Sequence, residues 1–213
     1  MNVLALDAAL GGFSAALARD GRIAAWRCES GHVALERGLA LVDDILSAAR
    51  FNADQIDRLA VGIGPGSFTG LRIAIAYAKS LAAVWQRPLV PVDSFDLLEY
   101  GSNLAEALGV VVGRPGVISA RYRSPSASRR ASGRIDQVLD ALHLAPSELA
   151  VVGAPKDVLD ALAERGIIVR AFEPAVTPAA AAAALAAGFR TPKSLHEVRA
   201  DYGELPAAKP PRF

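Results

Sequence analysis

The first 28 residues contain three short apolar runs separated by turn signals, and this pattern limits the fold more than any other part of the sequence. The runs cover residues 3–8, 13–18 and 23–28. Gly11-Gly12 separates the first two, and Asp20-Gly21, a strong signal for a tight hairpin turn, separates the second from the third. The chain is therefore predicted to begin with a three-stranded antiparallel meander, and not with the strand–helix unit of a Rossmann domain.

The segments after the meander alternate between helices and strands. They are a helix over 35–50, a strand over 59–63, a loop over 64–70, a helix over 71–85, a strand over 89–92 and a helix capped by Ser94. Three strands, helix, strand, helix, strand and helix is the order of one half of an actin-like ATPase fold. By analogy with that topology we predict an α/β fold of the actin-like, ribonuclease H-like (ASKHA) class.

The second half of the chain contains shorter and less regular segments. Strands are predicted over 110–112, 117–122, 149–152 and 167–171, helices over 135–144 and 158–165, and a final helix from Pro178. Residues 123–133 are rich in Ser and Arg and are predicted to form a loop. The pattern predicts a first domain over 1–100, a reduced second domain over 101–190 and an extension over 191–213, extended from Leu205 onward by its prolines.

A glycine-rich segment joins the fourth predicted strand to the second helix. Glycines allow backbone conformations that other residues resist, and a hydroxyl just before a helix can cap its free N–H groups. A loop of this kind can instead bind an anion at the helix N-terminus, and the residues leave both functions open. A P-loop is excluded because no Lys follows the last glycine. The loop consists of Gly64, Pro65, Gly66, Ser67, Phe68, Thr69 and Gly70.

The string Gly-Pro-Gly-Ser-Phe-Thr-Gly-Leu-Arg-Ile over 64–73 resembles the signature of the TsaB family, formerly grouped with glycoprotease-like proteins. Residues 3–7, 13–17, 59–62 and 88–95 also resemble the strands and the helix start that surround this signature in the family. The resemblance is good over about residues 1–100 and thin beyond them. After Asp7 the family usually has Thr and Ser, whereas this chain has Ala8 and Ala9.

The resemblance implies a function in tRNA modification. Members of this family act as non-catalytic scaffold subunits for threonylcarbamoyl transfer to adenosine 37 of tRNAs that read ANN codons. The implied partners are a TsaD-like protein and a TsaE-like ATPase, with tRNA reached through the complex and a homodimer formed when the chain is alone. No intrinsic cofactor is implied, although ATP has a place in the complex. The alternatives are a small actin-like kinase or ATPase and a glycoprotease-like peptidase.

Few residues suggest catalysis by the chain itself. The TsaD relatives hold a metal through paired histidines on their first helix, whereas His32, His143 and His196 lie far apart and none has a second histidine at helix spacing. The G-x-S-x-G elbow of serine hydrolases is missing from the sequence. We therefore predict no catalytic residue and no metal site.

Asp7 ends the first predicted strand, where actin-like proteins contact a phosphate or a metal. Because Ala8 and Ala9 replace the usual hydroxyls, its carboxylate is more favoured as a cap for the following turn. Both functions remain open.

The two long predicted helices have more apolar surface than a single sheet covers. The apolar arc of the first helix spans about half its circumference, and the second helix is apolar nearly all round. The second is therefore either a central core helix or a helix with one face on the sheet and the other on a second protein, and the resemblance favours the second protein. The predicted partner interface consists of Leu41, Ile45, Ile73, Ala76, Tyr77, Ser80, Ala83 and Val84.

The formal net charge of +1 means that the whole surface cannot attract nucleic acid, so a local patch or a partner must provide such contacts. Five arginines at 121, 123, 129, 130 and 134 form the one basic cluster in the sequence. They form either a solvated loop or a phosphate contact to tRNA.

The single cysteine, Cys28, excludes an internal disulfide and is expected to be buried as a small apolar residue. The N-terminus lacks the basic start of a signal peptide. The alanine-rich run over 179–187 is too short to span a bilayer. These features predict a cytoplasmic protein with no membrane contact.

Overall fold

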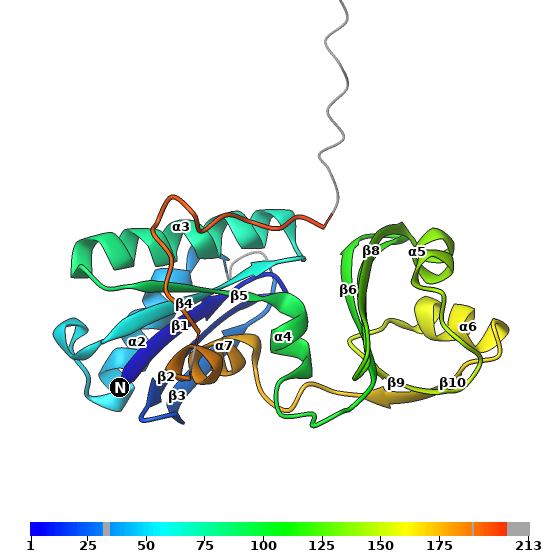
Figure 1. The fold of residues 1–213 in the computed structure, drawn as a ribbon. Coiled ribbons are helices and arrows are strands. Elements are labelled where there is room, and N and C mark those ends of the chain that lie inside the picture. The colour runs from blue at the N-terminus through cyan, green and yellow to red at the C-terminus, as the bar shows by residue number, and fades with distance from the viewer. Residues whose placement is uncertain (32–34, 189, 204–213) are drawn as a thin grey trace, which may run out of the picture.

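The computed structural model describes residues 1–31, 35–188 and 190–203 and contains two five-stranded sheets that lie side by side, each with its own helices (Figure 1). In the first sheet the strands follow the order β3-β2-β1-β4-β5. The first three strands are antiparallel neighbours, which confirms the predicted meander, whereas β4 and β5 continue the sheet in parallel with β1. Their bounds are β1 Asn2–Asp7, β2 Phe13–Arg19, β3 Arg22–Glu29, β4 Arg58–Gly64 and β5 Leu89–Asp93.

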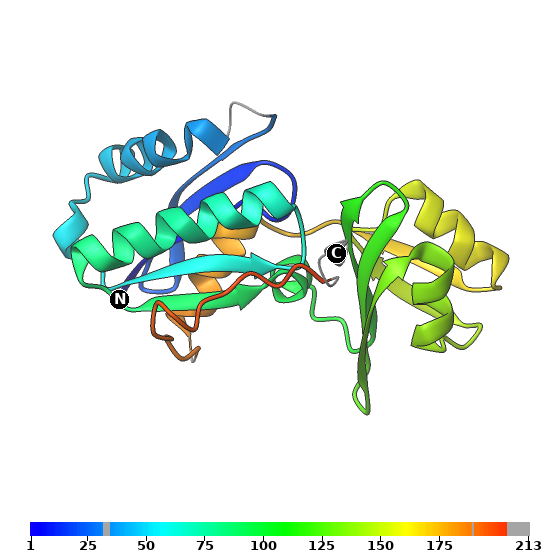
Figure 2. The same ribbon diagram turned by 90° about the horizontal axis from the view of Figure 1, so that it is seen from above.

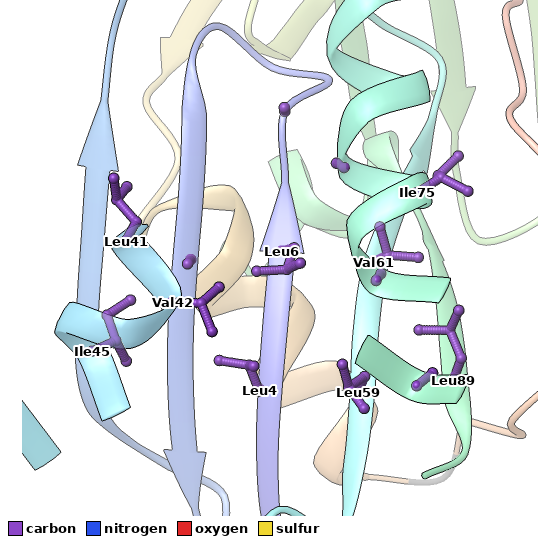
Figure 3. Packing of buried hydrophobic residues seen from close by; sticks show 14 of the residues in the cluster. Leu4, Leu6, Leu41, Val42, Ile45, Leu59, Val61, Ile75 and Leu89 are labelled. Atoms are coloured by element: carbon purple, nitrogen blue, oxygen red, sulfur yellow. The ribbon is translucent and has the colours of Figure 1, made fainter. Parts of the chain in front are cut away.

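Helices cover both faces of the first sheet. Alternate residues of β1 point to opposite faces, so Leu4 and Leu6 pack under α2 and α3, while Val3 and Ala5 pack against α7. Figure 3 shows the first of these clusters, in which Leu41 and Ile45 of α2 lie over the sheet. The helices of this unit are α2 Gly38–Ala49, the short 3-10 helix Ala53–Gln55, α3 Phe68–Trp85, α4 Ser94–Glu99 and α7 Pro178–Ala187.

The last helix, α7, packs on the first sheet although it follows the second sheet in sequence (Figure 1). Its alanines from Ala179 to Ala183 are buried against β1, β2 and β4, because side chains this small allow a helix to approach a sheet closely. The predicted second domain, 101–190, therefore includes a helix that belongs to the core of the first sheet. A periodicity argument could not detect this, since an all-alanine helix has no apolar stripe.

The second sheet repeats the strand order of the first, as β10-β9-β6-β7-β8. Helices α5 and α6 cover one face, and α4 packs toward the other. Two units with the same connectivity confirm the predicted actin-like fold. The elements are β6 Ala107–Arg114, β7 Val117–Arg123, β8 Ser128–Arg134, α5 Ile135–Leu142, β9 Glu148–Val152, α6 Lys156–Glu164 and β10 Ile168–Phe172.

Strand β8 lies within the segment that we predicted to be a Ser/Arg-rich loop, and that prediction is wrong. Its seven residues, Ser-Arg-Arg-Ala-Ser-Gly-Arg, pair with β7 along their whole length at the edge of the sheet. An edge strand with few apolar residues gives no strong strand signal in sequence. Because β8 completes the sheet, the second unit has as many strands as the first.

The C-terminal segment, residues 190–203, returns along α3 and the edge of the first sheet (Figures 1 and 2). Lys193 pairs with Leu89 of β5, the side chain of Val198 is fully buried in the first core, and the amide of Asp201 donates to the carbonyl of Ile63 at 2.7 Å. This segment is therefore part of the first unit. The extended tail predicted from Leu205 lies outside the described residues.

Cys28 is exposed on β3, the edge strand of the first sheet, so the expectation of a buried thiol is wrong. Most of the residues of β3 are exposed, and Cys28 lies near the end of this edge strand. Within the described ranges, no helix combines the length and the apolar character that a membrane crossing needs.

Candidate functional site

The motif loop connects β4 to α3, and Ser67 is the N-cap of the helix. Its hydroxyl accepts a hydrogen bond from the amide of Gly70 at 3.2 Å, and its own amide donates to the carbonyl of Ala9 at 2.9 Å. The predicted capping function is confirmed for Ser67. Thr69 lies exposed in the first turn of α3. Anion binding by the remaining first-turn amides stays a prediction.

Close packing explains the last glycine of the loop better than backbone freedom does. Gly70 lies inside the helix, and a Cβ at this position would be 1.8 Å from the carbonyl oxygen of Ala8. Gly64, in contrast, has a φ of +105°, a conformation that favours glycine. The loop is thus held tightly against the turn between β1 and β2, next to Asp7.

Asp7 is fully buried at the end of β1 and caps the turn that follows. Its Oδ2 accepts hydrogen bonds from the amides of Ala9 at 3.1 Å and Leu10 at 3.3 Å, while its Oδ1 has no partner among the described residues. Burial raises the pKa of Asp7 to about 6, against the opposing effect of the two amide hydrogen bonds. The turn-capping function is confirmed, and a phosphate or metal contact stays a prediction.

The outer face of α3 is exposed. The helix buries Leu71, Ala74 and Ala78 against the sheet, so the account of a central core helix is wrong. The opposite side carries small or apolar residues in solvent, and Val84 is 77% exposed. We call this side the α3 outer face; it consists of Ala76, Ser80, Ala83 and Val84.

Two further residues of the predicted interface lie beside this face. Tyr77 is partly buried between α3 and the residues before α2, where its hydroxyl donates to the carbonyl of Leu35 at 3.3 Å. Its ring meets Phe13 edge-on at a centroid distance of 6.1 Å. Ile73 is also partly buried. Both positions border the exposed strip without forming its centre.

Leu41 and Ile45 do not belong to an exposed interface, and this part of the prediction is wrong. Their side chains are 1% and 0% exposed and pack in the first core (Figure 3). The apolar arc of α2 is wide enough to be oriented in two ways, and the helix turns Leu41 and Ile45 inward while Leu39 is left exposed.

Three arginines of the basic cluster contact carboxylates at the end of β5 and on α4. The guanidinium of Arg121 contacts Asp96 at 2.6 Å and Glu99 at 2.9 Å, and Arg123 contacts Glu99 at 2.7 Å. Arg130 contacts Asp93 at 2.7 Å. The solvated-loop interpretation is therefore wrong for these three arginines, whose charges join the second sheet to the first unit.

The same acidic residues were not identified as functional from sequence. Burial alone would raise the pKa of Asp96, but the hydrogen bonds and charges of Arg121 and Arg190 outweigh it and leave this pKa below its ordinary value. Asp93, Asp96 and Glu99 are spaced at three residues, so they share one side of a short helix. This spacing is the sequence signal from which an acidic cluster on α4 could have been predicted.

No group of three or more His, Cys, Asp or Glu side chains that could hold a metal occurs in the part of the chain that the structure describes. His143 ends α5 in the second unit and His196 lies in the C-terminal segment. His32 lies outside the described residues.

The matching family model and the curated relatives are described by two names, the transferase TsaD and the biosynthesis protein TsaB, and both concern threonylcarbamoyladenosine in tRNA. The model of the family described as "TsaD: tRNA N6-adenosine threonylcarbamoyltransferase" matches residues 32–195. The tRNA threonylcarbamoyladenosine biosynthesis protein TsaB of Escherichia coli is 38% identical over 104 residues, and that of Haemophilus influenzae is 35% identical over 77. A solved structure of YeaZ from Pseudomonas aeruginosa superimposes with a TM-score of 0.72 at 24% identity and covers 94% of this chain and 99% of its own.

The sequence matches are partial. The match to the Escherichia coli protein covers 48% of this chain and 44% of that protein, and the match to the Haemophilus influenzae protein covers 36% and 33%. The chain therefore aligns with less than half the length of either relative. Its fold, in contrast, superimposes on the Pseudomonas aeruginosa structure over nearly the whole length of both chains.

Proposed function

Because the chain belongs to the TsaB family, within the wider family described by the transferase model, we propose that it takes part in the biosynthesis of threonylcarbamoyladenosine in tRNA. In this proposal it is a scaffold subunit without a catalytic site of its own. It supports threonylcarbamoyl transfer to adenosine 37 of tRNAs that read ANN codons. The transferring enzyme is a TsaD-like partner, a TsaE-like ATPase joins the assembly, and ATP acts there.

The observation that carries the proposal is the α3 outer face. Ala76, Ala83 and Val84 form an exposed apolar strip on an 18-residue helix. Contiguous apolar surface of this kind commonly marks a protein–protein contact. Small side chains allow a partner helix to approach to about 8 Å. This geometry supports pairing with a TsaD-like protein, or with a second copy of the chain when that partner is absent.

The scaffold function is supported by how the candidate catalytic groups are used. The hydroxyl of Ser67 caps α3, and Oδ2 of Asp7 accepts hydrogen bonds from two turn amides. Both groups serve the local fold. The reacting groups for transfer would then come from the partner.

The test introduces a charge on the α3 outer face. Ala83→Glu places a carboxylate where a partner would remove water from it, so it should abolish self-association and binding to a purified TsaD-like partner. The matched control is Ala163→Glu, which changes an exposed alanine on α6 of the second unit. Light scattering after size exclusion measures both associations, and circular dichroism checks the fold.

A reconstituted assay of threonylcarbamoyl transfer to tRNA completes the test. Transfer should require this chain together with its partner and should fall with Ala83→Glu but not with Ala163→Glu. Turnover by the chain alone would contradict the scaffold proposal. Tight ATP binding with hydrolysis by the isolated chain would favour a small actin-like ATPase, and peptide cleavage would favour a peptidase. Normal pairing of Ala83→Glu would place the interface elsewhere.

A further inference from the structure

A groove of about 460 Å³ lies between the N-terminal half of α3 and the C-terminal segment. Arg72 and Lys79 line it from the helix, and Arg199 and Tyr202 line it from the segment. Among the residues that the structure describes, the side chains that line the groove include no carboxylate. Within the described residues, none of the three cations forms an ion pair with an acidic group. The groove is therefore positively charged, although the chain as a whole has a formal net charge of only +1.

Two aromatic rings continue the groove at the motif loop. The centroids of Phe68 and Tyr202 lie 4.9 Å apart with 35° between the ring planes, and the guanidinium of Arg72 lies 5.2 Å from the centroid of Phe68. Phe68 is 56% exposed and Tyr202 is 37% exposed. We call Phe68, Tyr202, Arg72, Lys79 and Arg199 the aromatic–basic groove.

These exposures have no explanation within the fold of the chain. A phenylalanine at the first position of α3 could pack inward, as its neighbour Leu71 does, yet most of its surface meets solvent. Neighbouring aromatic rings that stay exposed beside cations without an acidic partner match the surfaces that bind single-stranded nucleic acid, where bases stack on aromatic faces and phosphates meet Lys and Arg. Tyr202 lies on the segment that the buried Val198 anchors, so the rings are held in place before any ligand arrives.

We propose that the aromatic–basic groove binds single-stranded RNA directly, with one or two unstacked bases on Phe68 and Tyr202 and the backbone phosphates at Arg72, Lys79 and Arg199. The proposal rests on the proposed function in one respect, because it takes the RNA to be the anticodon arm of a tRNA substrate. It differs from the sequence-based alternative of a phosphate contact at the arginines of β7 and β8. Three of those arginines are paired with Asp93, Asp96 and Glu99.

The groove and the proposed partner face adjoin along α3 and share Ala76. Ala83 and Val84 lie toward the C-terminal end of α3, one to three turns beyond Lys79 and Arg72. Only Ala76 borders both surfaces. A partner that contacts α3 at Ala83 and Val84 leaves Arg72, Phe68 and Tyr202 open to RNA.

The binding test uses the whole chain and fluorescently labelled RNA probes. A 17-nucleotide stem–loop with a seven-nucleotide loop and a single-stranded oligouridine should bind more tightly than a blunt RNA duplex of equal length, as measured by anisotropy. The logarithm of the binding constant should fall with the logarithm of salt concentration with a slope of about −2, the value for three phosphate contacts on a single strand.

Single-residue variants test base stacking and phosphate contact in the groove separately. Phe68→Ala and Tyr202→Ala should each weaken binding by at least about fivefold, the loss expected for one stacked base. Arg72→Gln and Lys79→Gln should each reduce the salt slope by about 0.7. Trp26→Ala and Arg22→Gln, on the exposed edge strand β3, are the matched controls and should change neither quantity.

Several outcomes would overturn the proposal. They are absence of RNA binding, equal affinity for the duplex, and groove variants that bind as the wild type does. Variants that weaken association with the TsaD-like partner while RNA affinity is unchanged would make the groove a protein contact instead. If the chain supports tRNA modification but binds no RNA, this inference fails and the proposed function stands. If the chain binds RNA in the groove but supports no modification, the proposed function fails and RNA binding by the groove stands.

Discussion

The guanidinium of Arg121, on β7 of the second sheet, lies 2.6 Å from the carboxylate of Asp96 on α4 of the first unit. The same guanidinium reaches Glu99 at 2.9 Å, and its side chain is only 8% exposed. Asp96 also pairs with Arg190, which follows α7. Three parts of the chain that are far apart in sequence thus share one network of charges at the boundary between the two sheets.

Replacement of Arg121 by Met should destabilise the protein strongly. Asp96 and Glu99 would each lose one of the two arginines that contact them, and the loss should approach about 3–5 kcal/mol, the cost of a broken buried pair. Urea unfolding at pH 7 measures the change. Arg165→Met is the matched control, because Arg165 pairs with Asp136 and Asp140, which are mostly exposed, and such pairs contribute about 1 kcal/mol or less. Equal losses in both variants would show that the network does not join the units.

Replacement of Gly70 by Ala separates helix propensity from close packing. Inside a helix, Ala is favoured over Gly by about 1 kcal/mol, so propensity alone predicts stabilisation. The contact of 1.8 Å with the carbonyl of Ala8 predicts the opposite, because backbone must move to admit the new methyl group. We expect a lower unfolding temperature and weaker association through α3.

Gly113→Ala serves as its control. Its Cβ would meet only the carbonyl of Val117, at 3.9 Å, so this variant should unfold as the wild type does. A stabilised Gly70→Ala would refute the packing explanation of the motif.

Local sequence signals were sufficient for the first half of the fold. The Asp20-Gly21 turn and the apolar runs of β1 and β2 define a meander without any tertiary information, because each hairpin depends on neighbours in the chain. The N-cap at Ser67 is likewise local, since its hydroxyl bonds to an amide three residues away. These features were predicted correctly.

Features that depend on distant partners were not predictable. The orientation of α2 depends on which side of its wide apolar arc meets β2, so Leu41 and Ile45 were assigned to the surface although they are core residues. The site of α7 depends on a sheet built more than 80 residues earlier. Arg121 was assigned to a solvated cluster because its partners on α4 lie more than 20 residues away. In each case the local sequence pattern was described correctly, but the partner that decides the position of the residue lies far away in the chain.

Replacement of Val198 by Ala tests whether the C-terminal segment belongs to the first core. The side chain is fully buried, and removal of two methyl groups should cost about 2 kcal/mol. Chemical unfolding of the isolated chain measures this loss. Val112→Ala, at a position that is 44% exposed on β6, should stay within about 0.5 kcal/mol of the wild type. If the two variants are alike, the segment adds nothing to the stability of the first unit.

Replacement of Asp7 by Asn should change how stability depends on pH. The pKa of Asp7 is about 6 in the folded protein and 3.8 as its ordinary value, so folding favours the protonated form. The contribution of this group to stability is complete below pH 3.8, declines as pH rises to about 6 and is lost above it. The difference between these values corresponds to about 3 kcal/mol.

An asparagine has no charge to bury, so the stability of Asp7→Asn relative to the wild type should increase from pH 4 to pH 7 by up to about 3 kcal/mol. The slope of this difference is the diagnostic quantity, because the unpartnered position of Oδ1 adds a constant offset that does not vary with pH. Asp20→Asn is the control. A hydrogen bond from the N-terminal amine lowers the pKa of Asp20, so its variant should be less stable than the wild type by a constant amount between pH 4 and pH 7, and this difference should shrink only as pH falls below 3.8. Parallel profiles for Asp7→Asn and the wild type between pH 4 and pH 7 would mean that the buried carboxyl is already ionised at the lower pH, and that the turn amides of Ala9 and Leu10 offset the full cost of its burial.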